Sequence, residues 1–594
     1  MTTPIHSASK LPALLLVGAL LVVPASLGAQ SEVGGEPTSR PVSGGDDMTY
    51  DGRAGELRVT VPQLDEVDVD VDGALDEPIW ERSALLRDFT QYEPSEGIPA
   101  AEDTEVLVLV DRDAIYFGVR ARDSAMEDLR ATLAERDEYT RNDDFVRFLL
   151  DTFDDQRRAY VFSVNPYGVQ HDGLWIEGGG GERRGFGPPI DDNPDFIWES
   201  SARRGGGGWT AEVRIPFKSL RFPEVPVQDW GFNVTRTVQR RGFEQSWAPI
   251  TSDAANQLAQ SGRLVGLRDL DPGMFLEINP VATGRRVGEY DGDVGGLVHD
   301  DFEPDFGVNV TYGLTSNLTL DGTINPDFSQ VEADAGQIAV NERFALFFPE
   351  KRPFFLEGTE IFSLPKRLIY TRSIADPVAG AKLTGKIGSL NVGYLGAVDR
   401  YDQGHDAAVN IVRARQDIGE SSTLGALYTD RTRSGDDYNR MGGMDARFVL
   451  GGRYTLTLLA AASRTAMEID DEEGDAAAPD ELTGSFLVAG LERAGRNFSF
   501  ETEVQDVGPD FRASSGFLRR IGDAHVTAST RLNDYGEPDA TVERVGVSLE
   551  GRGYWDHDDF WAGRRLKEGQ LELGGNVSFR NNITLFLNWT RSVF

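Results

Sequence analysis

The sequence predicts an all-β protein, in which a jelly-roll-like β-sandwich is followed by an antiparallel transmembrane β-barrel of roughly 14 strands. Three observations predict this fold class. Short apolar segments alternate with turn residues up to about residue 270, and the alternating segments become longer from about residue 274. After the N-terminus no run of about eighteen apolar residues occurs, so a closed barrel is the expected way for this chain to cross a membrane.

Residues 1–29 have the pattern of a secretory signal peptide. His6 and Lys10 precede an uncharged apolar run, and Pro24 and Ala29 lie where a cleavage site is expected. The alternative is an N-terminal membrane anchor. Residues 30–56 are rich in Gly, Ser, Pro and acidic residues, which predicts a disordered linker.

Residues 57–270 are expected to form the sandwich. Segments such as 106–110, 146–150 and 160–164 have the length and the apolar content of short antiparallel strands, and turn residues separate them. Few stretches in this region have a helical pattern.

Residues 271–594 are expected to form the barrel. Segments of about ten residues with one apolar and one polar face, such as 306–314 and 390–398, are typical of membrane barrels. Short turns, as at 313–316, contrast with long polar loops, as at 468–481. Membrane barrels have short turns on one side and long loops on the other, so this contrast also favours a barrel. A soluble sheet is the alternative, because alternation describes any half-buried strand. The terminal Phe594 resembles the assembly signal of outer-membrane barrels, and a truncated chain is the other interpretation.

Composition disfavours several partners. The chain of 594 residues contains 59 Lys and Arg against 97 Asp and Glu, and its net charge of −38 predicts that it binds no nucleic acid. It has no cysteine, and its six histidines do not have the spacing of an HExxH zinc site. No cofactor is expected, apart from the calcium ion considered below.

Several motifs resemble those of known families. Residues 71–80 (VDGALDEPIW) and 209–217 (WTAEVRIPF) resemble the opening and closing parts of carbohydrate-binding modules of family 9, and residues 115–123 and 142–146 agree with this. These modules are β-sandwiches, so the resemblance implies carbohydrate as a ligand. Arg147 stands where the family pattern usually has a Glu after an Asp-Asp pair.

Two downstream motifs resemble a second family. Residues 325–334 (NPDFSQVEAD) and 348–358 (FPEKRPFFLEG) are similar to a bacterial domain of unknown function, DUF5916. In that family such a module precedes an outer-membrane barrel. Together the two resemblances cover nearly the whole mature chain.

The resemblance to family 9 implies a sugar site. Its modules hold a terminal sugar between two tryptophans, which implies Trp175 and Trp198 here, since both lie beside acidic residues. The candidate partners for sugar hydroxyls are Arg120, Asn165, Gln170 and Asp172. The alternative for Trp198 is a core residue within a strand, and Trp80 is expected in the core.

Acidic residues suggest two further hypotheses. Asp143 and Asp144, with Asp123 and Asp151, offer oxygen ligands of the kind that Ca²⁺ prefers, although solvated turn residues are the alternative. A glycoside hydrolase needs two carboxylates facing a sugar. The candidates are Glu332, Asp334, Glu350, Glu357 and Glu360, for which an ion-pair network with Lys351 and Arg352 inside the barrel is the alternative.

The leading hypothesis is therefore an outer-membrane protein that recognises a glycan, and takes part in its uptake, with the sandwich in the periplasm and the barrel in contact with lipid. A glycan hydrolase of carbohydrate catabolism is the second hypothesis, although an enzyme is not favoured. A non-catalytic structural or protein-binding envelope protein is the third.

Overall fold

The computed structural model describes residues 48–138, 142–178, 190–273, 275–286, 288–292, 295–299, 301–326, 347–401, 405–433, 437–467, 480–537, 540–580 and 583–594. The expected signal peptide and most of the expected linker lie outside these ranges. Within the linker, however, residues 49–51 form strand β1 (Thr49–Asp51), which pairs in parallel with β3 (Ala84–Arg87). The predicted end of the disordered linker at residue 56 is therefore wrong, because β1 forms the edge strand of a sheet.

The N-terminal part is a sandwich of two sheets. The six-stranded sheet has the order β1, β3, β6 (Thr104–Val110), β7 (Ala114–Arg122), β13 (Gly208–Pro216) and β12 (Glu199–Gly205). The ten-stranded sheet contains, in order, β11 (Ile190–Asp191), β10 (Gln170–Ile176), β9 (Arg158–Val164), β8 (Phe145–Asp151), β14 (Val227–Val238), β15 (Phe243–Ser246), β4 (Thr90–Glu93) and β5 (Ile98–Pro99). In addition, β16 (Gly262–Arg268) pairs with β14, and β2 (Arg58–Thr60) pairs with β16. Their inner faces share one core, in which the rings of Phe117 and Phe148 stack at 4.4 Å.

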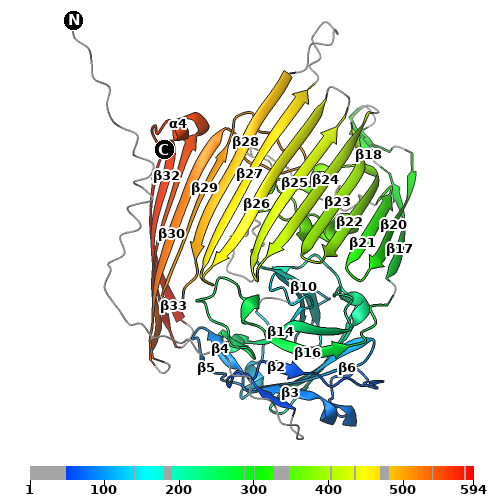
Figure 1. Cartoon of the computed structure of the whole chain (residues 1–594), viewed down its shortest axis with the longest axis vertical. Helices are drawn as coiled ribbons and strands as arrows, with labels where there is room; N and C mark the ends of the chain where they lie inside the picture. Colours follow the sequence, from blue (N-terminus) through cyan, green and yellow to red (C-terminus); the bar gives the residue numbers. More distant parts are fainter. Residues whose placement is uncertain are drawn as a thin grey trace, which may run out of the picture.

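The C-terminal part is one antiparallel sheet of 15 strands, called the barrel sheet below (Figure 1). Its order is β17 (Leu276–Arg285), β20 (Glu303–Thr315), β21 (Leu318–Ile324), β22 (Pro377–Ile387), β23 (Leu390–Tyr401), β24 (His405–Ile418), β25 (Ser422–Thr432), β26 (Tyr438–Leu450), β27 (Tyr454–Met467), β28 (Asp480–Arg493), β29 (Phe498–Val507), β30 (Asp523–Tyr535), β31 (Val542–Asp556), β32 (Glu568–Phe579) and β33 (Ile583–Val593). A short hairpin, β18 (Gly288–Asp291) and β19 (Gly296–His299), follows β17. The predicted fold class is confirmed, with 15 strands where roughly 14 were expected.

The two faces of the barrel sheet have opposite character. On β24, Val412 is 43% exposed, whereas the next residue, Arg413, is 1% exposed and pairs with Asp445. The large apolar side chains exposed on the sheet include Phe306, Leu320, Ile324, Tyr394, Val398, Tyr428, Met444, Leu458, Leu487 and Leu573. The buried side chains on the opposite face include Asp321, Thr323, Lys382, Thr429, Arg431 and Ser463. The outer face is therefore apolar, as in membrane barrels, whereas the inner face carries the polar residues together with buried apolar ones such as Leu395 and Val409.

None of the helices in the described ranges has the length and apolar character needed to cross a bilayer.

The inner face is covered by residues 347–376, called the inner segment below. It contains α3 (Pro353–Leu356), η6 (Thr359–Phe362) and η7 (Thr371–Ser373). Phe354 and Phe362 pack against Leu395 of β23 and Val409 of β24. The Lys382 side chain on β22 donates hydrogen bonds to the carbonyl oxygens of Phe354 and Glu357. The inner segment is thus held inside the curve of the sheet.

The sandwich lies at the end of the barrel sheet where the strands are joined by short turns (Figure 1). The turns on this side include 316–317, 388–389 and 419–421. The strand ends that bound the longer connections, such as Met467 of β27 and Asp480 of β28, lie at the opposite end of the sheet. The sandwich and these strand ends are therefore at opposite ends of the barrel sheet.

Candidate functional site

Three of the predicted sugar-binding residues meet at one end of the sandwich. The indole Nε1 of Trp198 donates to Asp172 Oδ1 at 3.1 Å, and Gln170 Nε2 donates to the Trp198 carbonyl oxygen at 3.1 Å. Arg136 forms ion pairs with Asp172 and with the exposed carboxylate of Asp195. Burial raises the pKa of Asp172 above its ordinary value, against the lowering effect of these donors. Sequence reasoning missed Arg136 and Asp195, which no local motif marks.

This cluster has a polar rim and a buried aromatic base. Trp198 is only 4% exposed and belongs to the core between the two sheets. It is therefore a core residue, which was the alternative to a sugar-stacking role. Asp137, Asp172 and Asp195 bring carboxylate oxygens within 4.8 Å of one another. The guanidinium of Arg136 lies among them and supplies the compensating positive charge. The group that solvent reaches most easily is Asp195, followed by the partly exposed side chains of Asp137 and Arg136.

Trp175 lies on the other face of the same sheet. It packs with Leu149, Val161 and Leu258, in a cluster separate from the core that contains Trp198. Trp175 and Asp172 are three positions apart on β10, and side chains alternate along a strand, so the two point to opposite faces. The two tryptophans therefore do not face each other across a common ligand, as the resemblance implied.

The remaining candidates are divided between the two sheets. Asn165 is 1% exposed and holds a turn, because its Oδ1 accepts from the backbone N–H groups of Tyr167 and Val169. Arg120 is on β7 of the other sheet, 3.5 Å from Glu105. The structure thus brings Gln170, Asp172 and Trp198 together and leaves the others apart.

The calcium candidates have structural partners. Asp143 accepts from the backbone N–H and the hydroxyl of Thr132, and Asp144 accepts from the N–H groups of Arg130 and Gln239. Both residues are 2% exposed, so they are not the solvated turn residues of the alternative either. N–H and O–H donors occupy the oxygens that a calcium ion would need.

The acids considered for hydrolysis are held in ion pairs where the structure describes them. Glu350 is 2.8 Å from Arg352 Nη2 and accepts from Thr371 Oγ1, and these contacts lower its pKa against the raising effect of burial. Glu357 and Glu360 pair with arginines of the sandwich, as described below. Glu332 and Asp334 lie outside the described residues.

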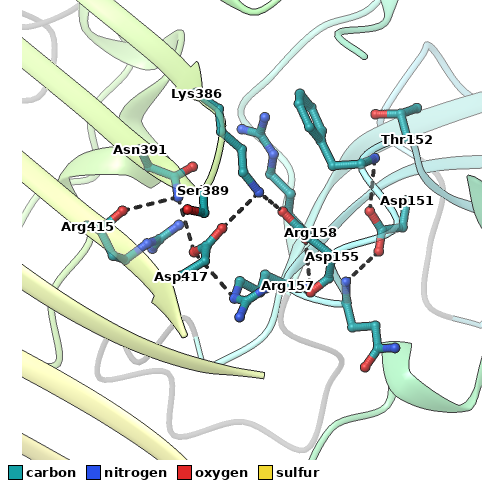
Figure 2. Close-up of polar contacts among 12 residues, drawn as sticks. Asp151, Thr152, Asp155, Arg157, Arg158, Lys386, Ser389, Asn391, Arg415 and Asp417 are labelled. Carbon is teal, nitrogen blue, oxygen red and sulfur yellow. Dashed lines mark hydrogen bonds and ion pairs between the residues drawn. The ribbon is translucent and has the colours of Figure 1, made fainter. Parts of the chain in front are cut away.

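Figure 2 shows a second cluster, where the sandwich meets the barrel sheet. Lys386 of β22 forms ion pairs with Asp155 of the sandwich and, at 2.8 Å, with Asp417 of β24. Arg157 lies 3.3 Å from Asp417 and donates to the carbonyl oxygen of Gly419 at 2.7 Å. The four charged side chains are at most 13% exposed. We call Asp155, Arg157, Lys386 and Asp417 the docking cluster.

Two further ion pairs join the sandwich to the inner segment. Arg158 Nη1 lies 3.1 Å from Glu360 Oε1, and Arg221 Nη2 lies 2.6 Å from Glu357 Oε1. Both arginines belong to the sandwich, and both carboxylates belong to the inner segment. The expected ion-pair network is therefore present: Arg352 pairs with Glu350 as expected, whereas the bases that pair with Glu357 and Glu360 come from the sandwich.

Asp151 shapes the turn that carries Asp155 and Arg157 of the docking cluster. Its carboxylate accepts from the backbone N–H groups of Phe153 and, at 2.6 Å, Gln156. Burial, and then the neighbouring charge of Asp155, raises the pKa of Asp151. In the unfolded chain, the carboxyl of Asp151 has the ordinary pKa of an aspartate. Its contribution to stability is therefore complete at pH values below that ordinary pKa, and it is lost as pH rises through the raised pKa of the folded chain.

We therefore expect the turn at 151–158 to loosen as pH is raised from about 5 to about 9. Hydrogen exchange of the amides in this turn would measure the change. Asp151→Asn removes the titrating group and should flatten the pH dependence, whereas an unchanged profile in the variant would assign the loosening to another group.

The two family-9-like motifs bind each other. Glu212, in the closing motif, accepts from the indole Nε1 of Trp80 at 3.0 Å and from the backbone N–H groups of Asp72 and Gly73, all in the opening motif. Gly73 has φ +87°, and a Cβ there would lie 2.9 Å from the backbone of Ala202. The motifs thus close the sandwich onto itself, and Trp80 is in the core as predicted.

Comparisons with known proteins were made for the sequence and for the structure. Residues 287–386 match the family described as "Domain of unknown function (DUF5916)". This stretch contains both downstream motifs, so the resemblance that they carried is confirmed there. No match was found among curated proteins.

Solved structures of at least two kinds are similar to this chain. A carbohydrate-binding module of family 9 from Caldicellulosiruptor kristjanssonii, in complex with cellotriose, is 14% identical and covers 36% of this chain and 95% of its own, with a TM-score of 0.26. OccAB2 of Acinetobacter baumannii is 10% identical and covers 76% of this chain and 91% of its own, with a TM-score of 0.24. OpdK of Pseudomonas aeruginosa, with vanillate, is 11% identical and covers 76% and 94%, with a TM-score of 0.25. These TM-scores are below 0.5, so the function of this chain has to be argued from its own contacts.

Proposed function

We propose that this chain is an outer-membrane protein whose periplasmic sandwich recognises carbohydrate. The observation that carries the membrane location is the segregation of the barrel sheet into an exposed apolar face and a buried polar face. Outer-membrane barrels have their short turns on the periplasmic side. The sandwich contacts the short turns, which supports its place in the periplasm.

Recognition of carbohydrate is supported by the polar rim around Asp172. Arg136, Gln170 and Asp195 offer the carboxylate, amide and guanidinium groups that bind sugar hydroxyls. The buried indole of Trp198 forms the base of this rim through its hydrogen bond to Asp172. A sugar would therefore be held mainly by polar contacts at this end of the sandwich.

Binding can be tested on the full chain in detergent micelles. Glucose, cellotriose and insoluble glycans would be titrated or co-sedimented, with Gln170→Ala and Asp195→Asn as variants. We expect both variants to weaken binding, whereas Asp229→Asn, an exposed carboxylate on β14 of the same sheet, should not. Absence of binding by the folded chain would refute the recognition of these carbohydrates.

A structural role is the second candidate, because the sandwich is fixed to the barrel sheet by buried contacts. Trp175 supports this docking indirectly: its Nε1 donates to Glu177 at 3.1 Å, and Glu177 accepts from the N–H groups of Gln257 and Leu258. This loop contacts the barrel turn at Ser421 through Asn256. Under this alternative, Trp175→Phe weakens docking and no glycan binds.

A further inference from the structure

The short-turn end of the barrel sheet is covered by the sandwich at several hairpins. Arg157 binds the turn between β24 and β25, and the backbone N–H of Ala255 donates to the Gly452 carbonyl oxygen at 2.8 Å, in the turn between β26 and β27. Asp253 accepts from the N–H of Arg496 at 2.9 Å, in the turn between β28 and β29. The sandwich therefore contacts three successive hairpin turns of the curved sheet, from β24 to β29, instead of a single strand.

The inner segment continues this cover into the interior. Its α3 and η6 pack against β23 and β24, and its Glu357 and Glu360 pair with Arg221 and Arg158 of the sandwich. The sandwich and the inner segment thus form one stack, which extends from the short-turn end into the curve of the sheet.

The contact between the two parts is polar. Five apolar core clusters occur in the described residues, and each lies wholly within the sandwich or wholly within the barrel part. Ion pairs and hydrogen bonds therefore join the parts, without a shared apolar core. Interfaces of this kind resemble those of domains that move relative to each other.

We propose that the sandwich is a releasable stopper, so that the barrel is a gated passage for small solutes. In the docked state the sandwich and the inner segment close the short-turn end. Release breaks the docking cluster together with the Arg158–Glu360 and Arg221–Glu357 pairs. This inference rests on the proposed membrane location and does not depend on carbohydrate recognition.

The candidate sugar site is connected to this contact by β10. The strand carries Gln170 and Asp172 at one end and leads to Glu177 at the other, where the Glu177 N–H donates to the Arg157 carbonyl oxygen at 2.8 Å. A shift of β10 would therefore move Arg157 of the docking cluster. A ligand at the polar rim could favour release by this route.

Because the chain has no cysteine of its own, a thiol reagent can join two introduced cysteines selectively and reversibly. Asn256 Nδ2 donates to Ser421 Oγ at 2.9 Å across the contact, so Asn256→Cys and Ser421→Cys can be bridged by a short bis-methanethiosulfonate reagent, which dithiothreitol cleaves. The full chain with these two changes and Lys386→Met is reconstituted into liposomes. Swelling in glucose is then measured before and after cleavage, and flotation with the liposomes confirms insertion.

We expect the bridged protein to be closed and its cleavage to speed swelling by about tenfold or more, because Lys386→Met has removed the central charge of the cluster. The two single-cysteine variants should not respond to the reagent. As an independent arm, a protease site placed after Gly273 allows the sandwich to be cut off and washed away, which should also open the passage.

Equal swelling of the bridged, cleaved and sandwich-free proteins would overturn the stopper. Failure to float with the liposomes would instead refute the membrane location, and the stopper with it. Loss of glycan binding alone would leave the result unchanged, which separates this inference from the carbohydrate part of the proposed function.

Discussion

Lys386→Met is expected to weaken docking of the sandwich by about 3–5 kcal/mol, the usual cost of removing one partner from a buried ion pair. The Lys386 side chain is 6% exposed and lies between the carboxylates of Asp155 and Asp417. Without the ammonium, two buried negative charges remain, and they are compensated only by Arg157 beside Asp417 and by the nearby charge of Arg158 at Asp155. Hydrogen exchange of the amides at 153–158 and 416–421 measures the loss of protection.

Lys567→Met is the matched control. Lys567 also pairs with an aspartate, Asp556, but both side chains are more than half exposed, so we expect an effect below about 1 kcal/mol. Adding Asp155→Asn to Lys386→Met should restore part of the protection, because it removes one uncompensated charge. If both lysine variants had the same small effect, the docking cluster would not hold the sandwich in place.

The fold could be predicted because alternation along a strand is a local property. Val412 and Arg413 are neighbours in the sequence, and their opposite burial follows directly from the alternation of side chains. The same alternation of burial occurs along β21 and β25, so the fold class follows from the sequence. The 15 strands agree with the predicted count of roughly 14, although exact strand boundaries depend on pairing partners and could not be predicted.

The candidate site could be predicted only in part, because it depends on which face each side chain takes. Trp175 and Trp198 have the same local appearance, an indole beside acidic residues. Placing them required knowledge that residues 170–176 form a strand and that its two faces pack against different partners. The Asp-Asp pair at 143–144 looked like a solvated turn for the same reason.

The docking cluster could not be predicted from the sequence at all. Asp155 and Lys386 are 231 positions apart, and neither belongs to a recognisable motif. Their meeting depends on how two separately folded parts are placed, which no periodicity encodes. The family-9-like motifs, in contrast, were visible in the sequence, but the structure gives Trp80 and Glu212 a role in closing the sandwich.

Glu212→Ala is expected to lower the free energy of unfolding of the sandwich by about 3–5 kcal/mol, since it leaves buried N–H groups without an acceptor. Three donors depend on this carboxylate: the Trp80 indole and the backbone N–H groups of Asp72 and Gly73. Glu212 itself is 0% exposed, so water cannot replace it without opening the core. Urea unfolding of the full chain, followed by tryptophan fluorescence, measures the effect.

Two comparisons separate the role of the carboxylate from the loss of side-chain volume. Trp80→Phe removes one donor and keeps the other two bonds to Glu212, so its cost beyond lost packing should be about 1 kcal/mol. Glu199→Ala removes an exposed glutamate of the neighbouring strand β12, which pairs with Arg214, and should cost less than about 1 kcal/mol. Equal urea midpoints for Glu212→Ala and Glu199→Ala would mean that the two motifs do not depend on each other. A larger loss with Glu212→Ala would instead mean that the two motifs, although typical of sugar-binding modules, stabilise the sandwich. This role would not depend on which ligand binds at the polar rim.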